Sequence, residues 1–92
     1  MLDVFKTKFA AAGFTELSPI QTAVAEPLAA GQSVLGLAPT GSGKTLAFTW
    51  PMLEALRGGE GTQALILAPS QELAMQTTNV VREWGQLIDA TV

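Results

Sequence analysis

The chain has 92 residues and a net charge of −3, and it contains no cysteine and no histidine. This length fits one domain at most, and the apolar fraction of 48% indicates a globular chain rather than a disordered one. The composition excludes disulfide frameworks and histidine-based acid–base chemistry, and five basic residues argue against a self-sufficient nucleic-acid binder. Because no apolar run is as long as a membrane span and no secretory signal opens the chain, we expect no membrane partner and a cytoplasmic location.

The first element is expected to be a short amphipathic helix over residues 2–12. Leu2, Phe5 and Phe9 recur at helical spacing, and Gly13 is a typical residue to end such a helix. A helix with one apolar face normally packs against the rest of its domain, so we expect a packing role for this one.

A second helix is expected from Ser18 to about residue 28. Ser18 and Gln21 form an S-x-x-Q capping box, with Pro19 at the first helical position. On this local evidence Gln21 would only satisfy backbone groups, and Phe14 would only pack against the helix start. Pro27 predicts a kink or an early end.

A phosphate-binding loop over residues 38–45, A-P-T-G-S-G-K-T, follows a predicted strand over residues 33–38 and opens a helix expected over 44–56. Small residues let backbone N–H groups point at phosphate oxygens, and the helix start adds further donors. Lys44 would contact the β- and γ-phosphates, and the Thr45 hydroxyl would bind Mg²⁺. The alternative is a tight strand-to-helix turn with an exposed lysine. The residues predicted to hold the phosphates are Thr40, Gly41, Ser42, Gly43, Lys44 and Thr45.

The second half of the chain predicts one more strand and one more helix. Residues 64–68 are apolar on both faces, as in a buried parallel strand, and a helix is expected to follow to about residue 88. Two parallel strands joined through a helix make one crossover unit, so we expect an α/β fold with parallel strands flanked by helices. Both strands would lie at a sheet edge, which implies a larger domain or pairing with a second copy.

The catalytic carboxylate that hydrolysis would need is not evident. A phosphate-loop hydrolase requires an acid at the end of another strand to hold Mg²⁺ and orient water. Glu72 comes nearest, just after the second predicted strand, but it is also the type of residue that a helix dipole favours in the first turn. With Lys44 only contacting phosphate, nucleotide binding is better supported than hydrolysis.

Three segments stand out along the chain: G-F … P-I-Q between Gly13 and Gln21, the loop at 38–45, and P-S-Q-E-L-A-M-Q at 69–76. Together they resemble successive motifs of DEAD-box RNA helicases, in the family's order. The resemblance covers essentially the whole chain and implies a partial RecA-like phosphate-loop NTPase domain, of which residues 1–92 would be the N-terminal part, ending after the third motif. It implies ATP or ADP and Mg²⁺ as ligands. Gln21 would read the adenine edge, and Phe14 would stack on the adenine face.

The third segment resembles the family's first RNA-facing element. This resemblance implies that Pro69, Ser70 and Gln71 touch the sugar-phosphate backbone of RNA, which positions RNA without reading its sequence. The family usually has arginine where this chain has Gln71, and the loss of a bidentate donor weakens that contact. Hydrolysis and unwinding would need parts of the helicase beyond these motifs, so the RNA partner belongs to the full-length parent.

Two other interpretations remain open. A stand-alone, non-catalytic nucleotide-binding module that self-associates through exposed strand edges would account for the missing carboxylate. A phosphate-loop enzyme of another family, such as a small kinase, would account for the loop but not for the segment from Phe14 to Gln21.

Overall fold

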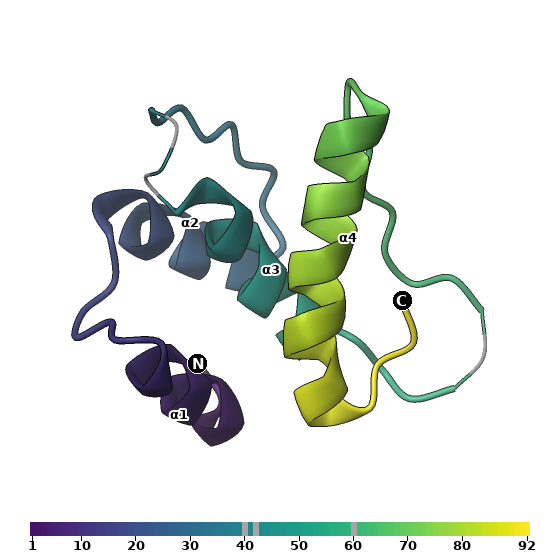
Figure 1. The fold of residues 1–92 in the computed structure, drawn as a ribbon, viewed down its shortest axis with the longest axis horizontal. Coiled ribbons are helices and arrows are strands. Elements are labelled where there is room, and N and C mark those ends of the chain that lie inside the picture. Colours follow the sequence, from purple (N-terminus) through teal and green to yellow (C-terminus); the bar gives the residue numbers. More distant parts are fainter. Residues whose placement is uncertain (40, 42, 60) are drawn as a thin grey trace.

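The computed structural model describes residues 1–39, 41, 43–59 and 61–92. Helices α2 and α3 lie side by side, and α4 packs against α3 (Figure 1). None of the helices in the described ranges is long and apolar enough to cross a membrane. The elements, in chain order, are α1 (Asp3–Ala11), α2 (Pro19–Ala29), α3 (Lys44–Glu54), α4 (Gln71–Gly85) and the 3-10 helix η1 (Gln86–Ile88).

A cluster of aromatic and aliphatic side chains joins α1, α3 and α4. Phe5 on α1 is fully buried, and its ring centroid lies 5.8 Å from that of Trp84 on α4. Trp50 and Leu53 bring α3 into the same cluster. Burying side chains of this size stabilises a fold by about 1.5–3 kcal/mol each. The cluster therefore fixes the three helices against one another, and it is completed by Phe9 and Val81.

A Schellman motif ends α1. Gly13 has a φ of +92°, in the left-handed region. Its N–H donates to the carbonyl of Ala10 at 3.0 Å, while the N–H of Phe14 donates to the carbonyl of Phe9 at 3.3 Å. These are the two reversed hydrogen bonds of the motif, and an apolar contact across the turn commonly accompanies them. Here that contact is a ring stack, because the centroids of Phe9 and Phe14 lie 4.9 Å apart.

The four predicted helices are confirmed, with small shifts at their ends. Helix α2 continues past Pro27 and ends at Ala29, so the early end predicted from this proline is wrong. Helix α4 ends at Gly85, and the predicted final turn is the 3-10 helix η1. Helical periodicity reports a local preference, which these segments satisfy with their own backbone hydrogen bonds.

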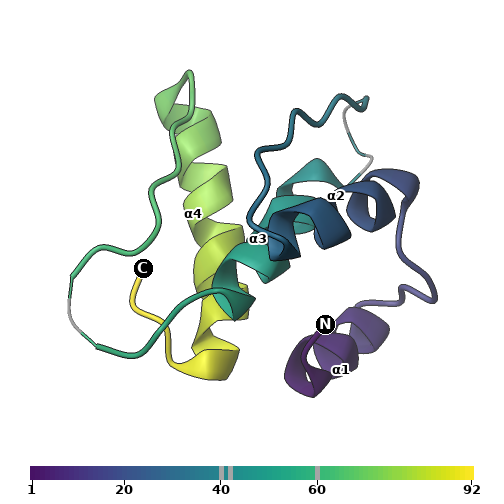
Figure 2. The same ribbon diagram turned by 180° about the vertical axis from the view of Figure 1, so that it is seen from behind.

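The prediction of parallel strands flanked by helices is wrong. Residues 33–38 and 64–68 are extended but form no strand, and the described part of the chain contains no sheet. The two segments lie on opposite sides of α4 (Figures 1 and 2). A strand needs a neighbour to pair its backbone N–H and C=O groups, and this separation keeps each segment from being the neighbour of the other.

In each of these two segments one face is less exposed than the other, and no residue of either segment is buried. A Cβ at Gly36 would lie 3.4 Å from the Ile20 side chain, so the inner face of the first segment packs against α2. The neighbouring Leu35 is 85% exposed, and Leu67 in the second segment is 86% exposed. Alternation of this kind follows from the period of two in an extended backbone. The apolar side chains of both segments therefore remain largely exposed in the structure.

The Schellman motif predicts that Gly13→Ala destabilises the fold by about 1–2 kcal/mol, because L-residues other than glycine are strained in left-handed backbone. An added Cβ would meet no atom within 4 Å, so the loss would come from the backbone alone. Urea unfolding followed by the helical circular dichroism signal measures it. Gly58→Ala is the control, since its Cβ also enters open space and its φ is not left-handed. Equal effects of the two substitutions would contradict this assignment.

Candidate nucleotide site

The Gln21 amide joins the start of α2 to the predicted phosphate loop. The N–H of Ser18 donates to Gln21 Oε1 at 2.9 Å, and Gln21 Nε2 donates to the carbonyl of Gly43 at 3.4 Å. The side chain of Gln21 is only 5% exposed. The structure therefore brings together two of the sequence-predicted site segments, and the same amide also caps α2.

Gly43 brings the loop close to the Gln21 side chain. A Cβ built on Gly43 would lie 2.5 Å from Gln21 Nε2, a distance at which the amide would have to move. The φ of Gly43 is +87° and that of Gly41 is +83°, both in the left-handed region. Glycine at both positions permits this left-handed backbone, and glycine at position 43 also leaves the space that the contact with Gln21 needs.

Lys44 and Thr45 open α3 directly after this glycine. Gly43 is the N-cap of α3 and supplies no side-chain cap, so the first-turn N–H groups remain available to a ligand. Lys44 is exposed and makes no ion pair with any residue in the described ranges. Helix N–H groups, the positive end of the dipole and a lysine charge together fit a phosphate group. Thr40 and Ser42, also predicted to hold phosphate, lie outside the described residues.

Phe14 lies on the segment between α1 and α2 and is 53% exposed. One face of its ring lies against Phe9 at an interplanar angle of 29°. Phe14 therefore packs on α1, and the local expectation that it would only pack against the start of α2 is not what the structure shows. The ring retains open surface that a flat ligand could contact.

The residues predicted to touch RNA lie at the start of α4. In both views this end of α4 is well separated from the start of α3 (Figures 1 and 2). The Oγ of Ser70 accepts a hydrogen bond from the N–H of Leu73 at 3.2 Å, so Ser70 caps α4. Pro69 and Gln71 are exposed. The structure does not bring these three residues to the phosphate loop.

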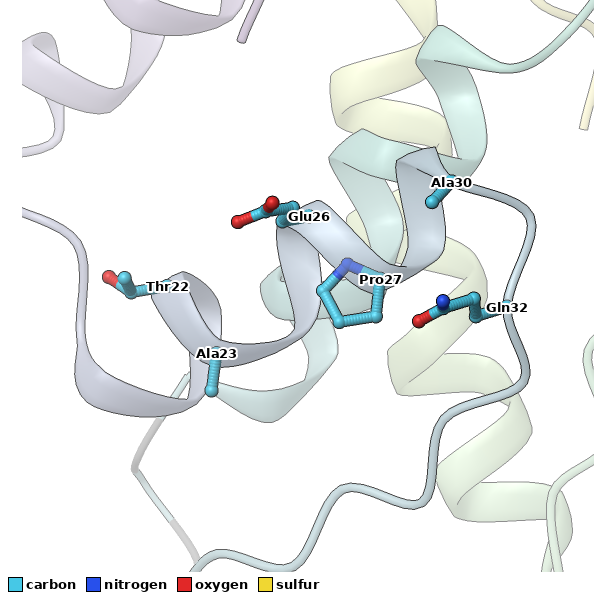
Figure 3. A pocket seen from close by; sticks show the side chains of 6 residues that line it. All are labelled: Thr22, Ala23, Glu26, Pro27, Ala30 and Gln32. Carbon is cyan, nitrogen blue, oxygen red and sulfur yellow. The ribbon is translucent and has the colours of Figure 1, made fainter.

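Two hollows lie beside α2, and neither is by itself a phosphate site. On the outer side of α2, Gln32 points back toward Pro27 and Glu26 projects from the helix (Figure 3). Among the described residues that line that hollow, Glu26 alone is charged, and its charge would repel phosphate. The second hollow lies between α2, α3 and the first extended segment, and it is apolar except for Lys44.

Two contacts near the candidate site were not predicted from the sequence: the stack of Phe9 on Phe14 and the approach of the Ser18 hydroxyl to Gly43. The predicted capping box of Ser18 and Gln21 is present at the start of α2, and the Ser18 Oγ is buried. That oxygen lies 3.4 Å from a Cβ built on Gly43, next to the loop. For Phe9 a signal was present, because an apolar residue just after a helix-ending glycine commonly contacts the residue five places before it.

Comparison with known proteins gives a consistent result over most of the chain. A family model described as DEAD/DEAH box helicase matches residues 18–92. The ATP-dependent RNA helicase HAS1 of Candida glabrata is 47% identical over 76 residues, which are 77% of this chain and 15% of that protein. The ATP-dependent RNA helicase dbp10 of Sclerotinia sclerotiorum is 48% identical over 80 residues, which are 84% of this chain and 9% of that protein.

A third relative agrees with these two. The ATP-dependent RNA helicase HAS1 of Candida albicans is 44% identical over 84 residues, covering 86% of this chain and 15% of that protein. The chain thus spans between 9% and 15% of the length of these relatives. Since the family model covers residues 18–92, well over half of the sequence, this chain belongs to the DEAD/DEAH box helicase family.

Proposed function

We propose that this chain is the nucleotide-holding part of an ATP-dependent RNA helicase and that it binds ATP or ADP with Mg²⁺. The observation that supports this most directly is the hydrogen bond from Gln21 Nε2 to the carbonyl of Gly43. It links an amide that can recognise a base to the loop that can hold phosphates. A single nucleotide could then contact both segments.

The hydrogen-bonding capacity of Gln21 suits adenine. A glutamine amide has two N–H donors and an oxygen with two lone pairs. Ser18 uses one lone pair and Gly43 uses one donor, so one donor and one acceptor remain. Adenine presents an amino donor beside a ring-nitrogen acceptor, whereas guanine presents two acceptors on the equivalent edge. The remaining pair of Gln21 groups therefore matches adenine better than guanine.

The phosphate end would use Lys44 and the N-terminal N–H groups of α3. Thr45 would contribute its hydroxyl to Mg²⁺, which neutralises phosphate charge when it is bound. The described residues hold no cluster of three or more His, Cys, Asp or Glu suited to a metal. In this proposal the phosphate oxygens of the nucleotide are further ligands of Mg²⁺. In this proposal the chain holds the nucleotide, and hydrolysis and unwinding require further parts of the parent helicase.

RNA contact would be a minor contribution of this chain. Gln71 is exposed at the start of α4 and can reach a phosphate oxygen, while the hydroxyl of Ser70 is already engaged as a cap. Contacts of this kind position RNA without reading its sequence. With a net charge of −3, the chain would depend on the rest of the helicase for most of its RNA affinity.

Lys44→Ala should weaken ATP binding by about tenfold to a hundredfold, because a hydrogen bond to a charged group contributes about 1.5–3 kcal/mol. Calorimetric titration of the 92-residue chain with Mg-ATP measures this. Lys6→Ala, which removes an exposed lysine from α1, is the matched control and should bind ATP like the wild type. If both variants bind ATP with the wild-type affinity, Lys44 has no phosphate role.

Gln21→Ala should lower the preference for ATP over GTP, by about a factor of ten, because the lost amide leaves the adenine edge without its partners. The ratio of the two dissociation constants is the measurement. Gln32→Ala removes an exposed glutamine just beyond α2 and should leave the ratio unchanged. A wild-type chain that binds the two nucleotides equally, with no response to Gln21→Ala, would rule out adenine reading by Gln21.

The exposed leucines favour a second candidate function, a stand-alone, non-catalytic nucleotide-binding module that self-associates. Leu35 and Leu37 are 85% and 83% exposed, and Leu65 and Leu67 are 79% and 86% exposed. Each segment thus exposes two leucines that lie two residues apart, and exposed apolar patches commonly mark interaction sites. A second copy could cover these segments without any strand within one chain.

Self-association predicts a mass well above 9.6 kDa by light scattering, and the double substitution Leu35→Ser with Leu67→Ser should return the mass to the monomer value. Met75→Ser on α4 also removes an exposed apolar side chain and serves as the control that should not change the mass. A wild-type chain that stays monomeric would exclude this candidate.

A further inference from the structure

We propose that Phe9 is a positioning residue for the adenine base: it holds Phe14 so that the open face of the Phe14 ring can stack on the base. This inference rests on the proposed nucleotide-binding function. It assigns a role to a side chain that the sequence analysis placed only on a packing face. Phe9 itself would not touch the nucleotide.

The two rings differ sharply in their surroundings. Phe9 is 8% exposed and belongs to the core cluster with Phe5 and Trp84. Phe14 is 53% exposed. Their centroids lie 4.9 Å apart at an interplanar angle of 29°, which is within the range of favourable aromatic pairs. The buried Phe9 ring therefore supports one face of the Phe14 ring, and the other face of Phe14 is open.

The backbone alone cannot hold the Phe14 ring in this orientation. The two hydrogen bonds of the Schellman motif fix the main chain of Gly13 and Phe14, but they leave the side-chain torsions of Phe14 undetermined. A half-exposed side chain without a neighbour keeps its rotamer freedom and loses it when a ligand binds. Stacking on the buried Phe9 ring restricts that freedom beforehand, which favours binding.

The support acts at the base end of the site only. Phe9 lies on α1, whereas the phosphate-holding residues Gly43 and Lys44 lie at the start of α3. Loss of the Phe9 ring should therefore weaken binding of a nucleotide but not binding of a phosphate chain that has no base. A general loss of packing would weaken both, so the two ligands separate a positioning role from a structural one.

The test compares Phe9→Leu with Phe5→Leu, because both substitutions remove a core ring from α1 and only Phe9 stacks on Phe14. Each folded variant is titrated calorimetrically with Mg-ATP and with magnesium tripolyphosphate. We expect Phe9→Leu to bind ATP about threefold to tenfold more weakly and to bind tripolyphosphate like the wild type. Phe5→Leu should keep the wild-type ratio of ATP affinity to tripolyphosphate affinity, because the core ring that it removes supports both ends of the site. If Phe9→Leu loses its helical circular dichroism signal, Phe9→Met replaces it, since methionine keeps the apolar volume without a flat ring.

Phe14→Ala separates this inference from the proposed function. ATP binding that is weakened by Phe14→Ala but not by Phe9→Leu would overturn the role of Phe9 and leave the nucleotide site intact. Equal weakening of ATP and tripolyphosphate in Phe9→Leu would also overturn it, because that result would indicate a general structural defect. A wild-type chain that binds no ATP would overturn the inference together with the proposed function.

Discussion

The contact of Phe5 with Trp84 is the interaction on which the rest of the structure depends. It places α1 against α4, and Trp50 and Leu53 bind α3 into the same cluster. The polar contacts of α1 cannot replace it. Lys8 pairs with Glu83 at 2.8 Å, but Glu83 is 60% exposed, and surface pairs of this kind contribute about 0–1 kcal/mol. Both ends of the proposed site are attached to this cluster, the base end through α1 and the phosphate end through α3.

Helices were predictable from the sequence, and strands were not, because the two depend on interactions of different range. The apolar residues of α4 recur with helical spacing, and Ser70 caps the helix start locally, so residues near each other in sequence decide the helix. The apolar runs at 33–38 and 64–68 predicted buried parallel strands, and neither run forms a strand. Whether such a segment becomes a strand depends on a partner strand, which no periodicity in the segment itself can report.

The parts of the site that could be predicted were those marked by short sequence motifs. The glycine loop and the S-x-x-Q pattern were both visible, and the sequence left open whether Gln21 caps a helix or serves a ligand. The structure shows why the two interpretations do not exclude each other: the Gln21 oxygen accepts from Ser18, and its nitrogen reaches Gly43. That second contact joins residues 22 positions apart, and it depends on the packing of α2 against α3. Sequence spacing could not supply it.

The two ends of the proposed site depend on different physical interactions. At the base end, Phe14 rests on Phe9, and the underlying support is apolar burial, which salt does not screen. At the phosphate end, Lys44 is exposed and the helix terminus acts through its dipole, and both of these attractions weaken as ionic strength rises. Gln21 is a buried hydrogen-bonding group that contacts the loop at Gly43. In the proposed site it would also contact the base, so that one side chain would hold both. In a chain with a net charge of −3, holding a polyanion therefore depends on local arrangement at the start of α3 rather than on the overall field of the protein.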